Sequence, residues 1–207
     1  MPIELAELVR PDHTALVTQE CQNGVVGTGP TVFPQLAEIA RRHMVPNAAR
    51  LAAAARAAEV QVVHCVVARR ADGRGSNDNA RLFAAARKSP VALTPGAAAA
   101  EVIPEIGTEP QDIVLDRLHG LGPFHGTELD AVLRNLGVRT VVGVGVSINV
   151  GMTNFAMDAV NAGYEFVLPR DAVAGVPEDY AEAVIDNTLS LLATVVRTED
   201  VLAAWSG

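Results

Sequence analysis

The sequence predicts a three-layer α/β/α fold, a Rossmann-like arrangement in which helices cover both faces of a mostly parallel sheet. Short runs rich in β-branched residues alternate with longer runs rich in Ala and Leu, as in chains whose helices connect parallel strands. Of the 207 residues, 49% are hydrophobic, which is enough for a full core. No repeat or linker interrupts the pattern, so we expect a single domain over residues 1–207.

The expected strands are five short apolar segments, residues 14–18, 60–67, 112–118, 140–146 and 165–169. Helical spacing predicts helices over residues 33–58, 126–136, 152–162 and 180–196, and a short helix over 97–101. Pro46 should divide the first of these helices, since proline suits a first helical turn and breaks an interior. The polar, Gly-rich stretch 68–81 is expected to form a loop after the second strand.

The net charge and the cysteine content indicate which partners and which cellular compartment to expect. The net charge of −8 argues against nucleic acid or a membrane surface as a partner. No apolar stretch has the length of a membrane span, and the N-terminus lacks the regions of a signal peptide. Cys21 and Cys65 are too few for a disulfide framework, so we expect a cytoplasmic protein. The only lysine, Lys88, lies in a polar stretch and is expected to be solvated.

The carboxyl ends of parallel strands are where open α/β sheets bind ligands. This rule selects five segments as the wall of the candidate site: residues 20–23, 68–74, 117–124, 147–151 and 170–173. The join between the fourth strand and the helix after it adds unpaired backbone N–H groups and a positive dipole end, which suit an anion.

Motifs in these segments resemble those of a known family. The sequence Glu-Cys-Gln-Asn at 20–23 is similar to Asp-x-Gln-Asn, and Gly-Pro-Phe-His-Gly-Thr-Glu-Leu at 122–129 is similar to Ser-Ala-Phe-x-Gly-Thr-x-Leu. Gly-Val-Ser-Ile-Asn-Val-Gly-Met at 145–152 is similar to Gly-Val-x-x-Asn-x-Cys-Val, and the Asp-Ala, Gly-Tyr and Asp-Ala pairs of 158–172 follow in order. The chain thus resembles the isochorismatase-like hydrolases, which include nicotinamidases, N-carbamoylsarcosine amidase and isochorismatases.

The resemblance implies three catalytic positions, an Asp, a Lys and a Cys, and all three differ here. The Asp position is Glu20, the Lys position falls on Leu118 with Arg117 beside it, and the Cys position is Gly151. A glycine cannot form a covalent intermediate. Isochorismatases also resemble this chain, because they carry Gly at the same place and hydrolyse a vinyl ether after protonation by the carboxylic acid.

Glu20, Arg117 and Gly151 are therefore the candidate catalytic positions, each with a structural alternative. Glu20 is either a general acid or base or a carboxylate bonded to loop N–H groups. Arg117 could orient an anion but cannot exchange a proton near neutral pH, and a strand that continued through Leu118 would turn it away from the pocket. Cys21 is expected to be a buried, inert thiol, and its use as a displaced nucleophile is a remote third option.

Six further residues are candidates for substrate binding: Gln22, Arg69, His119, Phe124, Ser147 and Asn149. The resemblance implies a cis peptide between Val146 and Ser147 and an oxyanion site of backbone N–H groups at Ser147 and Gly151. Ser147 and Asn149 could equally be helix caps, and His119 could be polar surface. The stretch 68–74 lacks the histidines of metal-binding relatives, so we expect no metal and no cofactor.

Two functions remain open. The first is hydrolysis of a small, anionic metabolite by acid catalysis from Glu20, without a covalent cysteine intermediate. The second is a catalytically inactive relative that binds a metabolite or a protein partner. A pocket closed by Leu118 and Phe124, with Glu20 in backbone hydrogen bonds, would favour the second; an open cavity with Glu20 unpaired would favour the first. We also expect a homo-oligomer of unspecified size.

Overall fold

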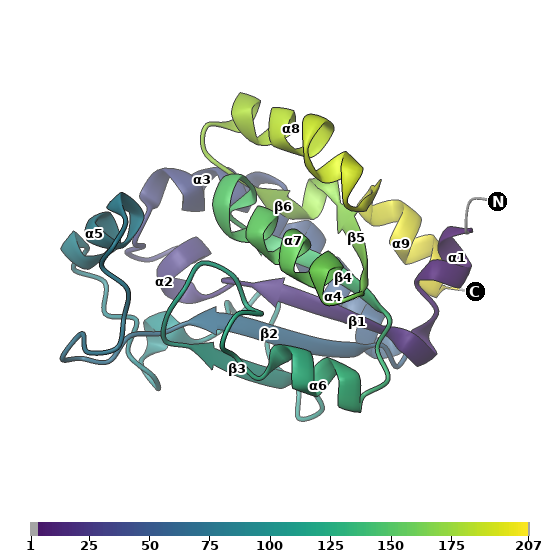
Figure 1. Ribbon diagram of the computed structural model, residues 1–207, viewed down its shortest axis with the longest axis horizontal. Helices are drawn as coiled ribbons and strands as arrows, with labels where there is room; N and C mark the ends of the chain where they lie inside the picture. The colour runs from purple at the N-terminus through teal and green to yellow at the C-terminus, as the bar shows by residue number, and fades with distance from the viewer. Residues whose placement is uncertain (1–3, 207) are drawn as a thin grey trace.

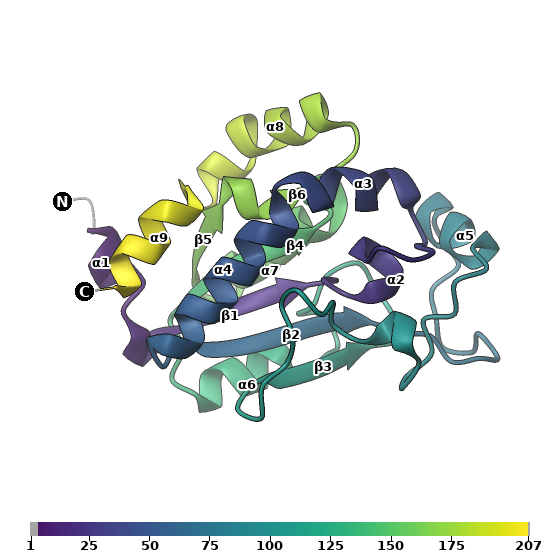
Figure 2. The ribbon, with the colours of Figure 1, turned by 180° about the vertical axis from the view of Figure 1, so that it is seen from behind.

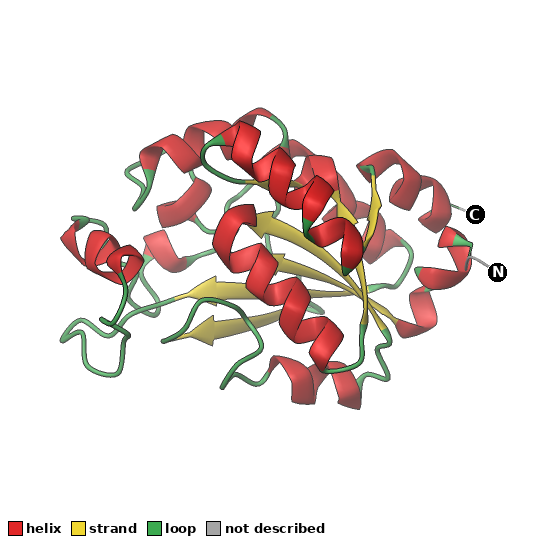
Figure 3. Cartoon of the chain, turned by 45° about the horizontal axis from the view of Figure 1, so that its top comes forward, coloured by secondary structure: helices red, strands yellow, loops and turns green. Residues whose placement is uncertain are grey.

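A sheet of parallel strands forms the centre of the computed structural model, which describes residues 4–206 (Figures 1 and 3). The strand order is β3-β2-β1-β4-β5-β7, and the short β6 pairs with β4. The strands are β1 (Thr14–Gln19), β2 (Gln61–Val67), β3 (Ile113–Arg117), β4 (Thr140–Val146), β5 (Glu165–Pro169), β6 (Val173–Ala174) and β7 (Thr194–Val196). The predicted fold class is confirmed, and the five expected strands are all present within a residue or two of their bounds.

Helices cover both faces of the sheet (Figures 1 and 2). On one face lie α4 (Met44–Ala57) and α9 (Thr198–Trp205), and on the other lie α6 (Leu129–Asn135), α7 (Thr153–Asn161) and α8 (Glu178–Asn187). The remaining helices are α1 (Leu5–Leu8), α2 (Asn23–Val26), α3 (Pro34–Arg42) and α5 (Arg81–Lys88). Of residues 4–206, no helix is both long and apolar enough to cross a membrane.

The helix predicted over 33–58 is divided, as expected, but at His43 rather than at Pro46. Pro46 lies in the first turn of α4, where its missing N–H costs no helical hydrogen bond. The helix predicted over 126–136 begins later, at Leu129, because Gly126 has a positive φ of 69° and belongs to a turn. A 3₁₀ turn (Ala98–Ala100) forms where a short helix was predicted.

The helix predicted over 180–196 is wrong in its second half. It ends at Asn187, and the β-branched run Thr194–Val196 forms the edge strand β7, which pairs with β5. Backbone pairing with an open sheet edge outweighs the helical spacing of the apolar residues there. The polar connection after β2 also contains a helix, α5, that was not predicted.

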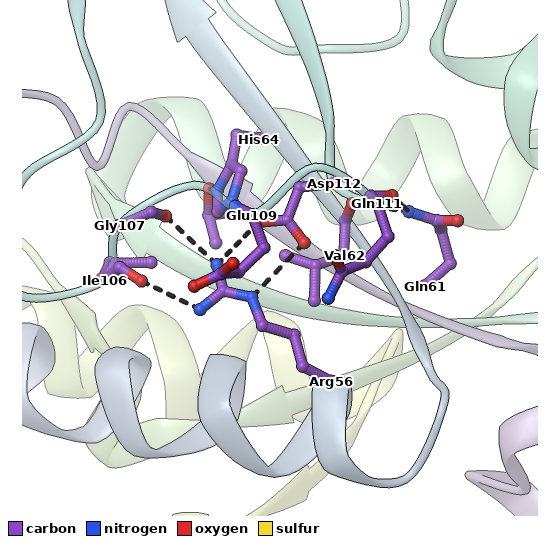
Figure 4. Close-up of polar contacts among 10 residues, drawn as sticks. Arg56, Gln61, Val62, His64, Ile106, Gly107, Glu109, Gln111 and Asp112 are labelled. Carbon is purple, nitrogen blue, oxygen red and sulfur yellow. Dashed lines mark hydrogen bonds and ion pairs between the residues drawn. The ribbon is translucent and has the colours of Figure 1, made fainter.

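A buried polar network links β1 and β2 to Asp112, the residue that precedes β3 (Figure 4). The His64 ring on β2 lies 2.9 Å from Thr18 Oγ1 on β1 and 3.3 Å from Asp112 Oδ2, just before β3. Arg56 donates to the same carboxylate, with Nη2 at 2.7 Å from Oδ2. Burial lowers the pKa of His64 although Asp112 opposes this, so the neutral ring accepts from Thr18 and donates to Asp112.

This chain of hydroxyl, imidazole and carboxylate groups is structural rather than catalytic. The order of groups is that of a nucleophilic triad, but Thr18 is only 1% exposed and lines neither of the two pockets described below. The side chain of Asp112 is fully buried, and its charge is balanced by Arg56. The network therefore fixes the relative positions of the strands that carry the candidate site.

Replacement of Asp112 should show how much this network stabilises the fold. Asp112→Ala leaves Arg56 and His64 buried without their partner, so we expect the free energy of unfolding to fall by about 3–5 kcal/mol. Chemical denaturation measures this loss. Glu199→Ala, which breaks the exposed pair with Arg50, is the control and should have a far smaller effect. Equal losses in the two variants would contradict the assigned role.

Candidate functional site

A pocket of about 400 Å³ opens at the carboxyl ends of the central strands. Its polar floor comes from strand ends and from the join after β4: Glu20, Arg69, Arg117, Ser147, Asn149 and Gly151. Its walls are mainly apolar and come from α2, α3 and α5 and neighbouring loops, including Val25, Phe33, Leu36, Leu82, Phe83 and Leu93. Such a site suits a small molecule with an apolar body and a polar head.

Glu20 places a carboxyl group at the floor of this pocket. It follows β1 directly and has a positive φ of 56°, while its backbone N–H donates to Cys65 O at 2.8 Å. The side chain is 21% exposed and forms an ion pair with Arg117. Burial raises the pKa of the Glu20 carboxyl above its ordinary value, and the charge and hydrogen bond of Arg117 offset this only in part.

Arg117 faces the pocket, because β3 ends at this residue. Its side chain is 5% exposed, and its guanidinium donates to Glu20, to His119 O at 3.0 Å and to Gly120 O. Leu118 lies outside the pocket and is 39% exposed. The positive charge next to the carboxyl group therefore comes from Arg117 and not from the position that the motif spacing marked for lysine.

The join between β4 and α7 carries Ser147, Asn149 and Gly151 along one side of the pocket. The peptide between Val146 and Ser147 is cis, as the resemblance implied, and a π-helical turn (Ile148–Met152) precedes α7. Ser147 makes no side-chain cap. Asn149 is no cap either, since its Nδ2 donates to Val176 O at 2.9 Å and its buried Oδ1 has no partner among the described residues.

Arg69 is the second cation of the pocket. It follows β2, and no carboxylate among residues 4–206 pairs with its guanidinium. Burial, and to a smaller extent the nearby Arg87, lowers its pKa below the usual value for arginine. An unpaired, partly buried guanidinium favours an anionic group on the ligand.

Three predicted binding residues do not line the pocket. Gln22 is fully buried and joins α2 to β2, accepting from Val67 N at 2.7 Å and donating to Val67 O at 2.9 Å. Phe124 is in the core against Phe155 and Tyr164, with ring centroids 5.7 Å from each. His119 packs against Gly126 in the loop after β3. These three side chains therefore pack or form hydrogen bonds next to the pocket, where they support its walls, and none of them faces its interior.

The segment 170–173, predicted as part of the wall, also lies elsewhere. Arg170 and Asp171 line a second pocket between α4 and α8, where Arg170 pairs with Glu182 and Asp186. Conversely, the walls from α3 and α5 were not predicted, because their apolar residues resemble ordinary core positions in the sequence. Helix α5 has no fully buried residue and turns Leu82, Phe83 and Ala86 to the pocket.

Neither cysteine is placed for catalysis. Cys21 is 1% and Cys65 is 4% exposed, and burial raises the pKa of each thiol to about 12. A thiol with such a pKa is not ionised near neutral pH and is a poor nucleophile. Within the described part of the chain, no group of three or more His, Cys, Asp and Glu side chains is placed to hold a metal ion.

Comparison with known proteins identifies a family and several related sequences. The model of the isochorismatase domain family matches residues 14–200. YwoC of Bacillus subtilis, an uncharacterized isochorismatase family protein, is 31% identical over 103 residues, which are 50% of this chain and 54% of that protein. Ureidoacrylate amidohydrolase RutB of Rhizobium rhizogenes is 26% identical over 96% of this chain and 85% of its own length.

Among solved structures, a cysteine hydrolase from Pseudomonas syringae pv. phaseolicola has a TM-score of 0.81 with 24% identity. The match covers 100% of this chain and 95% of that chain. This likeness shows the fold alone.

The coupling between the two charged residues can be measured directly. We expect Arg117→Met to raise the pKa of Glu20 further, since the guanidinium supplies the charge and the hydrogen bond that lower this pKa. NMR titration of the Glu20 carboxyl carbon measures the change. Arg69→Met removes the other cation of the pocket and should have a smaller effect. An unchanged Glu20 pKa in Arg117→Met would refute the coupling.

Proposed function

This chain belongs to the isochorismatase family, and from this membership we propose that it hydrolyses a small, anionic molecule by acid catalysis from Glu20. The observation that carries the proposal is the Glu20 carboxyl group at the floor of an open, mainly apolar pocket, beside a position 151 that has no side chain. Leu118 and Phe124 leave this pocket open, as this function requires, although Glu20 is not unpaired as expected but bonds to Arg117.

An enol ether of an acid is the substrate class that this arrangement fits. The protonated Glu20 would donate its proton to the terminal alkene carbon, which produces a cation stabilised by the ether oxygen. Water then adds to the cationic carbon and returns a proton to the Glu20 carboxylate. The resulting hemiketal separates into a keto acid and an alcohol, so one water is consumed and the acid is regenerated.

Amide hydrolysis through a thioester does not fit the same pocket. RutB relatives are named as amidohydrolases, and the cysteine hydrolase neighbour is named for its thiol. Here position 151 is Gly, and both cysteines of the chain are buried with raised pKa values. We therefore expect no turnover of ureidoacrylate, which serves as the amide probe.

Isochorismate is the enol ether probe, and Glu20→Gln is the decisive variant. The pKa of Glu20 is raised, so the active acid form persists to higher pH than an ordinary carboxyl group and is lost as pH rises through that pKa. We therefore expect kcat/KM of the parent protein to fall as the pH rises through the pKa of Glu20, which gives the pH profile a basic limb. We expect Glu20→Gln to lower turnover by at least about 100-fold at every pH.

A preserved melting temperature in Glu20→Gln would show that the loss is chemical. Unchanged turnover in this variant would rule out acid catalysis by Glu20. Binding of isochorismate without any turnover by the parent protein would instead support the inactive, ligand-binding relative. The observation that favours this second function is the ion pair with Arg117, whose charge opposes the rise of the Glu20 pKa and so favours the ionised carboxylate.

Arg69 should contribute to binding of the anionic head. We expect Arg69→Gln to raise KM for isochorismate by about tenfold or more, since a charge-assisted hydrogen bond contributes about 1.5–3 kcal/mol. The value of kcat should change little, because the anion is held equally in the ground and transition states. Arg74→Gln, on the same connection but outside the pocket, is the matched control. Equal KM values for the two variants would remove Arg69 from the binding site.

A further inference from the structure

The side chain of Gln19 is buried beneath Gly151 without a hydrogen-bond partner. Gln19 is the last residue of β1 and is 1% exposed. Both polar atoms of its carboxamide, Oε1 and Nε2, lack a partner among the residues that the structure describes. A buried amide in this condition is unfavourable and uncommon in native proteins, so its position calls for an explanation.

The carboxamide occupies the space that a nucleophilic side chain would need. A Cβ atom at Gly151 would lie 2.2 Å from Gln19 Nε2, closer than any non-bonded contact allows, and 3.4 Å from the carbonyl oxygen of Leu121. Gly151 and Leu121 both line the pocket. The amide therefore occupies the space of a side chain at position 151, behind two residues that line the pocket.

Two glycines make room for this residue. Gly145 pairs with Gln19 between β4 and β1, where an added Cβ would lie 2.1 Å from Gln19 O. Its φ of 122° is one that glycine adopts readily. Gly145 thus accommodates the backbone of Gln19, and Gly151 accommodates its side chain.

We propose that Gln19 positions the water that attacks the substrate. This inference rests on the proposed function, in which no thiol is present and water itself must reach the cationic carbon. A carboxamide can accept a hydrogen bond from that water and donate one to a neighbouring oxygen. Because no hydrogen bond holds the side chain, none must break for it to turn toward the pocket.

The role of Gln19 in this step is to orient and not to transfer protons. A C–O bond forms between the water oxygen and the cationic carbon, and the proton released from water goes to the Glu20 carboxylate. Gln19 gains and loses no atom. Its neighbour Glu20 donates the first proton, so two consecutive residues at the end of β1 would serve the two halves of one hydrolysis.

The test removes the amide and keeps the bulk, in Gln19→Met and, as a second variant, Gln19→Leu. With isochorismate as the probe, we expect kcat to fall about 100-fold, as when a reacting group loses its orientation. KM should stay within about twofold, and the basic limb set by Glu20 should remain. The melting temperature should rise by at least about 2 °C, because an unpaired buried amide has been removed.

A purely structural role would change the melting temperature and leave kcat intact. The control is Gln61→Leu, at the far end of β2, where the amide donates to Val62 O and Gln111 O at 2.9 Å each. This variant should lose thermal stability and keep kcat.

Three results would overturn the inference, and they separate it from the proposed function. If Glu20→Gln abolishes turnover but both Gln19 variants keep kcat within about threefold, only the role of Gln19 is wrong. If the parent protein does not turn over isochorismate, both proposals fail. If Gly151→Ala has an unchanged melting temperature, or Gln19→Ala does not relieve its loss, the carboxamide does not occupy this space.

Discussion

The ion pair between Glu20 and Arg117 is the contact on which the arrangement of the site depends. It joins the ends of β1 and β3, which are not neighbours, because β2 lies between them in the sheet. The pair therefore spans the end of β2 and forms part of the pocket floor. The guanidinium also donates to the His119 and Gly120 carbonyl groups, so the same side chain holds the loop that leaves β3. A change in either residue would alter both the electrostatics and the shape of the pocket.

The first three strands of the sheet carry two buried groups of charged residues, one enclosed in the protein and one at the pocket. The network of Arg56, His64 and Asp112 is enclosed, and its pairing serves stability alone. The Glu20 pair faces a pocket, where burial raises the carboxyl pKa and the guanidinium opposes the rise. The two systems differ in access. A ligand can reach the Glu20 carboxyl group, which can therefore take part in chemistry. The Asp112 carboxylate is enclosed, so its pairing contributes only to the stability of the fold.

The fold could be predicted from the sequence because apolar residues recur with different spacings in strands and in helices, and this spacing can be recognised within short segments. The edge strand β7 could not, since its pairing with β5 is a tertiary contact that overrides local spacing. For the site, motif register located Glu20, Ser147 and Gly151 in the pocket wall, whereas the pocket-facing direction of Arg117 depended on where β3 ends. Phe124 and Gln22 were predicted to line the pocket but do not, because the sequence does not distinguish a motif residue that packs in the core from one that binds a ligand. Gln19 gave no signal at all, because its contact with Gly151 comes from two distant segments.

The positions that differ from the motif implied by the resemblance lie next to one another in the structure. A glycine at position 151 leaves a void beside the end of β1, and the Gln19 carboxamide fills it. The Glu20 side chain, one methylene longer than the aspartate that the resemblance implies, pairs with Arg117, whose guanidinium approaches from two strands away. Loss of a nucleophile alone would leave an empty hole, and loss of a lysine alone would leave a buried carboxylate without a partner, which is costly. Here the Gln19 carboxamide fills the space beside Gly151, and Arg117 pairs with the Glu20 carboxyl group at the pocket floor. This matching supports the proposed hydrolysis over the alternative of an inactive relative.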